Sequence, residues 1–87
     1  MSTRTVIVGS PVGLHARPAA KLTQAVQAAG VPVRISLGDG EPVDAASVLA
    51  VMTLGAGHGD EVTLHAEDAD AILDQLAELI ASDLDSA

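Results

Sequence analysis

His15 and Arg17 are the two residues of this chain whose types and spacing most clearly suit a chemical step. They lie in the segment Gly13-Leu14-His15-Ala16-Arg17-Pro18-Ala19-Ala20. A neutral imidazole is a nucleophile that forms covalent intermediates. A guanidinium carries a permanent charge and a fork of donors that matches phosphate oxygens. Together they suit acceptance of a phosphoryl group, a reaction that depends mostly on positioning and charge stabilisation.

The residues around His15 place it immediately before a helix. Apolar residues recur at helical spacing over residues 16–29, and Pro18 is tolerated in a first turn, where its missing N–H would have no helical partner. Helix starts bind anions, phosphate included, and their partial positive charge disfavours the imidazolium form. Gly13 allows a tight turn before the histidine. The alternative is that His15 only caps the helix and Arg17 is a solvated side chain, but the combination of neighbours favours a phosphoryl acceptor.

The rest of the chain divides into short elements that must position this site. Period-two and helical patterns predict, in order, a strand at 5–8, a helix at 16–29, a strand at 31–37, an edge strand at 41–44, a helix at 47–54, a strand at 61–66 and a last helix. Ser47 is the predicted N-cap of the second helix, and Asp68 or Asp70 that of the last one, whose apolar stripe extends from Ile72 to Leu84.

This β-α-β-β-α-β-α order predicts an α+β fold. Helices on one face of an antiparallel sheet are the economical packing, and a later strand between the first two would give a split β-α-β arrangement. The 87 residues are expected to form a single domain, 1–87, with an aliphatic core, because the sequence has no Phe, Tyr or Trp.

The composition excludes several classes of function. The net charge of −8 argues against nucleic acid and anionic membranes as partners. The absence of cysteine excludes disulfides and thiolate metal sites, and His15, His58 and His65 have no local metal-ligand spacing, so no metal and no cofactor are predicted. The apolar run after Arg4 is too short for a signal peptide or a membrane span, and we expect a cytoplasmic protein.

The charges are divided unevenly along the chain. All 4 cations lie in residues 1–38 and all 12 acids in residues 39–87.

The second helix carries apolar residues on every side. Val51 and Leu54 can face the sheet, which leaves Val48, Leu49 and Met52 on the other side. A short helix of this kind in a small protein is either fully covered or presents a binding patch. We expect a binding patch, which a Met residue suits when several partners must fit.

The segment 13–19 resembles the active-site signature of HPr, the histidine-containing phosphocarrier of the bacterial phosphoenolpyruvate-dependent sugar phosphotransferase system. The segment 47–55 resembles that family's second signature. The resemblance implies an open-faced β-sandwich with antiparallel strand order 1-4-2-3 and three helices on one face. It implies a monomeric carrier rather than an enzyme, which accepts a phosphoryl group at Nδ1 of His15 from phosphorylated Enzyme I and donates it to IIA domains of sugar permeases. By the same resemblance, Ala16 and Arg17 hold the phosphoryl group, and partners dock on Ala20, Lys21, Val48, Leu49 and Met52.

Some positions depart from the family's pattern. Val12 stands where Asn or Ser is common, and Gln24, Ala46 and Ala50 stand where basic residues are frequent, so the docking face is less positive. Ser47 occupies the place that an ATP-dependent kinase phosphorylates in some members. Because cations are missing around it and Asp44 is near, we expect that Ser47 is not a working regulatory site.

Two other functions remain open from the sequence. One is a regulator that acts by docking alone, although such family members lack the active histidine. The other is a small α+β domain that binds anions at the helix start without covalent chemistry. Phosphoryl acceptance by His15 distinguishes the carrier from both.

Overall fold

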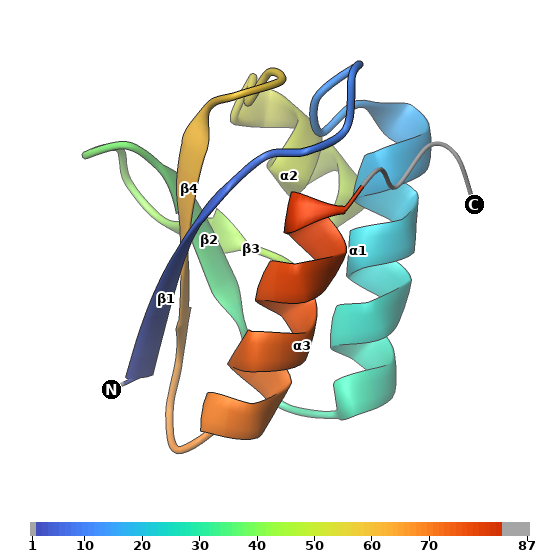
Figure 1. The fold of residues 1–87 in the computed structure, drawn as a ribbon. Helices are drawn as coiled ribbons and strands as arrows, with labels where there is room; N and C mark the ends of the chain where they lie inside the picture. The colour runs from blue at the N-terminus through green and yellow to red at the C-terminus, as the bar shows by residue number, and fades with distance from the viewer. Residues whose placement is uncertain (1, 83–87) are drawn as a thin grey trace.

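The computed structural model describes residues 2–82, which form the predicted order of strands and helices (Figure 1). The elements are β1 (Ser2–Ile7), α1 (Ala16–Ala29), β2 (Arg34–Leu37), β3 (Val43–Asp44), α2 (Val48–Thr53), β4 (Glu61–Ala66) and α3 (Asp70–Ala81). No helix within residues 2–82 is long and apolar enough to cross a membrane.

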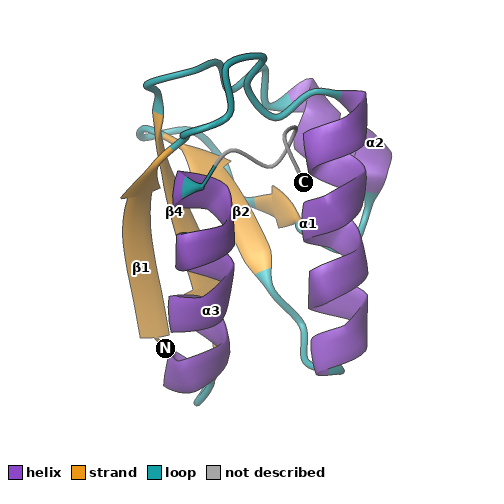
Figure 2. Cartoon of the chain, turned by 45° about the vertical axis from the view of Figure 1, so that its right-hand side comes forward, coloured by secondary structure: helices purple, strands orange, loops and turns teal. Residues whose placement is uncertain are grey.

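The strands form one sheet in the order β1-β4-β2-β3, in which all neighbours are antiparallel. β4 lies between β1 and β2, so α1 connects two strands that point the same way, as the split β-α-β prediction requires. The helices lie on one side of the sheet and leave its other face uncovered (Figure 2). The predicted α+β fold, an open-faced sandwich with order 1-4-2-3, is confirmed.

The core lies between the helices and the inner face of the sheet. Aliphatic side chains from both layers are almost completely buried there, and the largest are Val8, Leu22, Val26, Val33, Ile35, Val51, Val62, Leu64, Leu73 and Ile80. The predicted alternation in β4 is confirmed, because Val62, Leu64 and Ala66 are buried while Thr63 and His65 are half-buried. Burial of this aliphatic surface is the dominant contribution that holds the helices on the sheet.

Several boundaries differ from the sequence prediction. β1 starts at Ser2 instead of Thr5, because its pairing with β4 runs from Ser2↔Ala66 to Ile7↔Glu61. β2 starts only at Arg34, after Pro32, which has no N–H to donate to a ladder. The partner strand β3 is reduced to Val43–Asp44.

The predicted cap of the last helix is wrong. Ala69 is the N-cap of α3 and makes no side-chain capping bond, Asp68 has a positive φ of 46°, and Asp70 is already the first helical residue. A carboxylate in the first turn still interacts favourably with the helix dipole, which explains an acid here without a cap. Leu84, expected on the apolar stripe of this helix, lies outside the described residues.

Ser36 is buried although the alternation of β2 places it on the outer face. It lies opposite Thr63, and its Oγ is 3.0 Å from Nε2 of His65, so larger neighbours cover the small side chain. Ser36 therefore contacts the ring of His65 across the two paired strands.

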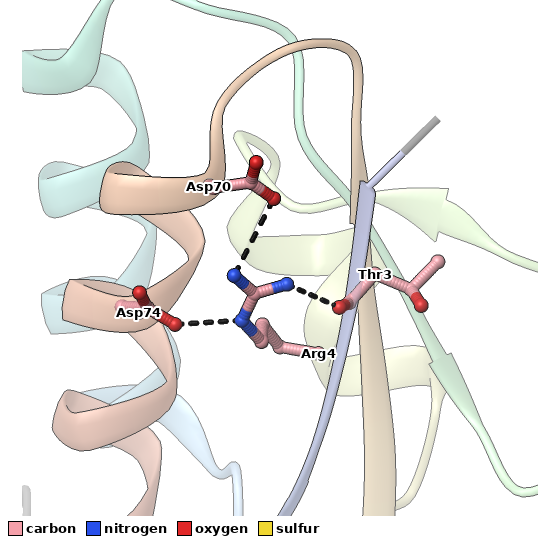
Figure 3. Close-up of polar contacts among 4 residues, drawn as sticks. All are labelled: Thr3, Arg4, Asp70 and Asp74. Carbon is pink, nitrogen blue, oxygen red and sulfur yellow. Dashed lines mark hydrogen bonds and ion pairs between the residues drawn. The ribbon is translucent and has the colours of Figure 1, made fainter.

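Arg4 connects the edge strand to the last helix (Figure 3). Its Nε donates to Oδ1 of Asp74 at 2.6 Å and Nη2 lies 3.4 Å from Oδ1 of Asp70, while Nη1 donates to the carbonyl of Thr3 at 2.7 Å. The hydrogen bond to Asp74 raises the pKa of Arg4 above its ordinary value. A cation of the basic first half of the chain therefore pairs with acids of the second half across the fold.

Candidate functional site

His15 is the N-cap residue of α1, and its side chain is exposed. Its backbone is extended, with φ −86° and ψ −168°, and its carbonyl accepts the first helical hydrogen bond from the Ala19 N–H at 2.7 Å. The imidazole makes no capping hydrogen bond. The alternative that His15 serves only to cap the helix therefore finds no support, because the helix uses its backbone and leaves the ring to other purposes.

The loop that carries His15 rests on a second loop at 55–59. Leu14, which is buried, donates its N–H to the carbonyl of Ala56 at 2.9 Å. Gly13 has φ +73°, and a Cβ added to it would collide with the carbonyl oxygen of Ala56 and lie 2.7 Å from Cα of Gly57. Gly13 is therefore required both for its left-handed backbone and for the close approach of the two loops. Together these contacts fix the point from which α1 starts.

A small pocket of about 180 Å³ opens beside the His15 ring. Its walls come from the histidine loop, the end of α2 and the loop that follows, and they are formed by Val12, Leu14, His15, Met52, Gly55, Ala56 and Gly57. Val12, half of whose surface is exposed, contributes an apolar wall where the family often has a polar residue. Of these residues, only His15 and Met52 are predicted from the sequence to lie at a functional surface.

The predicted phosphoryl-binding and docking residues of α1 follow His15 directly. Ala16 and Arg17 are the first two residues of the helix and are exposed, and no acid lies in this first turn. Ala20 and Lys21 are half-buried in the second turn. The first N–H groups of a helix have no acceptor within it, so a helix start in general attracts anions. The arrangement combines a nucleophile, a guanidinium and a helix N-terminus.

The second helix presents less exposed apolar surface than the sequence suggested. Leu49 is 75% exposed, but Val48 and Met52 are half-buried and pack against the core. Val51 is completely buried, whereas Leu54, expected to face the sheet, is only half-buried. The reason is that side chains on more than one side of this six-residue helix pack against the core. Leu49 is consequently the most exposed large apolar side chain at this face.

Ser47 is the N-cap of α2, as predicted. Its Oγ accepts the N–H of Ala50 at 3.2 Å, and the carboxylate of Asp44 accepts the N–H of Ala46 at 2.9 Å. The serine hydroxyl thus has a structural use at the start of the helix.

The other two histidines lie on separate elements. His58 is exposed in the loop before β4, and His65 is held by Ser36 on the uncovered face of the sheet. Among residues 2–82 no three His, Cys, Asp or Glu side chains are grouped closely enough to hold a metal ion.

Comparison with known proteins agrees with this geometry. The sequence profile described as "PTS HPr component phosphorylation site" matches residues 2–82. The phosphocarrier protein HPr of Streptomyces coelicolor is 52% identical over 87 residues, which cover 98% of this chain and 94% of that protein. HPr of Haloferax volcanii is 43% identical over 82 residues, covering 91% of this chain and 92% of its own.

A solved structure shows the same likeness. The crystal structure of HPr from Bacillus anthracis superposes with a TM-score of 0.81 at 32% sequence identity, and the match covers 91% of this chain and 95% of that one. Family profile, overall sequence and fold all agree, and they agree with the resemblance seen in segments 13–19 and 47–55. The chain belongs to the HPr family, the phosphocarrier proteins of the phosphotransferase system.

Proposed function

We propose that this chain carries a phosphoryl group on His15, accepting it from phosphorylated Enzyme I and passing it to IIA domains of sugar permeases. The observation that carries the proposal is the exposed imidazole at the N-terminus of α1, which the helix does not use as a cap. Membership of a phosphocarrier family supports it, since such a protein is itself modified as an intermediate and turns over no substrate of its own.

In the accepting step, Nδ1 of His15 attacks the phosphorus atom. A nitrogen–phosphorus bond forms on His15, and the bond between phosphorus and the donor breaks, with its electron pair left on the donor. Charge on the phosphoryl oxygens is stabilised by the start of α1, because the N-terminus of a helix carries partial positive charge and favours an anion. The guanidinium of Arg17 adds a cation at the same helix start. Transfer onward is the same step in reverse, with a IIA domain as acceptor.

Docking of both partners is assigned to the face formed by the first two turns of α1 and by α2. The two helices pack against each other (Figure 2). The helix α1, which carries Ala20 and Lys21, therefore lies beside α2, which carries Val48, Leu49 and Met52. Leu49 supplies the most exposed apolar surface of that group, and Met52 links it to the pocket beside His15. A partner that covers this face reaches the imidazole and the patch together. We place this activity in the cytoplasm and in a monomer.

Incubation with phosphoenolpyruvate and Enzyme I tests the proposal. Intact-protein mass should rise by one phosphoryl group, and His15→Ala should stay unmodified while its unfolding temperature is unchanged, because the side chain is exposed. A docking-only regulator or an anion-binding domain would gain no mass with a competent Enzyme I. Retention of normal modification in His15→Ala would remove His15 from the reaction.

A further inference from the structure

We propose that Asp60 is a positioning residue for His15, because its carboxylate holds the glycine-rich loop 55–59 in the shape on which the histidine loop rests. The inference rests on the proposed role of His15 and assigns a supporting residue to that site. Asp60 lies outside both signature segments and does not line the pocket beside the imidazole.

Asp60 closes a tight turn with Gly57. Its Oδ2 accepts the Gly57 N–H at 2.8 Å, and its own N–H donates to the Gly57 carbonyl at 3.0 Å. The turn is also tied to the end of β1, because the carbonyl of Asp60 accepts the Val8 N–H at 2.9 Å and the Gly59 N–H donates to the Val8 carbonyl at 3.0 Å. The carboxylate thus joins the middle of the loop to a point anchored on the sheet.

The loop needs such a brace because of its composition. Gly55, Gly57 and Gly59 alternate through it, and Gly55 and Gly59 have positive φ values of 69° and 86°. Glycine loses more conformational freedom on ordering than any other residue, so a loop of this kind is costly to hold in one shape. The carboxylate of Asp60 supplies this loop with a hydrogen bond from a side chain to its backbone, at the Gly57 N–H.

The geometry connects this brace to the imidazole in two steps. Gly57 and its neighbour Ala56 are the residues on which Gly13 closes, with no room for a Cβ between them. The carbonyl of Ala56 also accepts a hydrogen bond from the N–H of Leu14 at 2.9 Å, and His15 follows Leu14 in the chain. A shift of Gly57 therefore moves the surface that sets the position of Leu14 and of the N-cap that follows it.

The test compares Asp60→Ala, Asp60→Asn and the control Glu41→Ala, which removes a carboxylate from an exposed loop. Phosphorylation of His15 is timed with two donors: phosphorylated Enzyme I, which must dock, and phosphoramidate, a small donor that need not. Because misplacement of a reacting group by about an ångström can cost about a hundredfold and this brace acts indirectly, we expect Asp60→Ala to be slower by about threefold to tenfold with both donors. Asparagine keeps an acceptor oxygen, so Asp60→Asn should stay within about twofold of the unmodified protein.

A second measurement separates positioning from loss of stability. Amide hydrogen exchange at Leu14 should accelerate in Asp60→Ala, while Tm falls by less than about 4 °C, since the bond is solvent-exposed. Unchanged rates in Asp60→Ala would overturn the inference, as would a loss seen with Enzyme I alone, or an Asp60→Asn variant as slow as Asp60→Ala. If the unmodified chain reacts with phosphoramidate but not with Enzyme I, the proposed function fails while the comparison of variants still decides the role of Asp60. Reaction of His15 with neither donor would overturn both.

Discussion

Gly13 and Gly30 form a matched pair that tests how tightly the histidine loop is seated. Their φ values are +73° and +74°, so an alanine at either position meets the same backbone penalty, about 1–2 kcal/mol. Around Gly30 an added Cβ would find nothing within 4 Å, whereas at Gly13 it would collide with backbone atoms of Ala56 and Gly57. The difference between the two variants therefore isolates the contact between the loops.

The magnitude follows from what must move. Gly30→Ala should cost only the backbone term, about 1–2 kcal/mol. In Gly13→Ala the clashing atoms are backbone and cannot turn aside, so the loops must separate and the bond from Leu14 to Ala56, 2.9 Å long, is weakened or lost. A lost hydrogen bond adds about 1 kcal/mol, and partial exposure of the buried Leu14 side chain adds about 1 kcal/mol more. Gly13→Ala should thus be less stable by about 3–4 kcal/mol.

Urea unfolding of the two variants measures this difference directly. The free energy of unfolding of Gly13→Ala should be about 2 kcal/mol lower than that of Gly30→Ala, which corresponds to about 8–16 °C in Tm for a domain of this size. Phosphoryl acceptance should fall in Gly13→Ala and stay normal in Gly30→Ala. Equal stability of the two variants would show that the two loops do not constrain each other at Gly13.

Three further predictions concern charge, docking and the second helix. Arg17→Ala should still accept phosphoryl groups, because the helix start remains, but the rate in single-turnover labelling should be about tenfold to a hundredfold lower. An unchanged rate would remove Arg17 from the mechanism. Leu49→Asp should raise the KM for transfer from Enzyme I while the free energy of unfolding changes by less than about 0.5 kcal/mol, since Leu49 is 75% exposed; a large loss of stability would show that it supports the core. Ser47→Ala should lower stability by about 1 kcal/mol through loss of the cap, and Ser47 itself should resist modification by ATP and an HPr kinase; efficient phosphoserine formation there would contradict this.

Local patterns predicted most elements of the fold. Residues 16–29 and 61–66 have the bounds that spacing and alternation indicate, and Ser47 caps α2 as its residue type suggests. The position of His15 immediately before α1 could also be predicted from the sequence, because Pro18 is typical of the first turn of a helix. The assignment of residues 1–87 to one domain stays a prediction.

Features that depend on contacts between distant parts of the chain could not be predicted from local sequence patterns. The burial of Ser36 depends on His65 across the sheet, and the seating of Gly13 depends on Ala56 and Gly57, more than forty residues away. From the sequence, Gly13 is predicted only to allow a tight turn before the histidine. Likewise, the half-burial of Val48 and Met52 depends on how α2 packs against the core, which helical spacing alone does not specify.

Phosphorus NMR of the complete relay tests whether His15 passes a phosphoryl group from one partner to another. After incubation with phosphoenolpyruvate and Enzyme I, one phosphohistidine signal is expected, assigned to His15 by peptide mapping and to Nδ1 by its chemical shift. Addition of a competent IIA domain should remove that signal from this chain and produce it on the IIA domain, whereas His15→Ala should show no signal at either stage. A phosphoryl group on any other residue, or one on His15 that no member of a panel of IIA domains can accept, would show that His15 is not the carrier site.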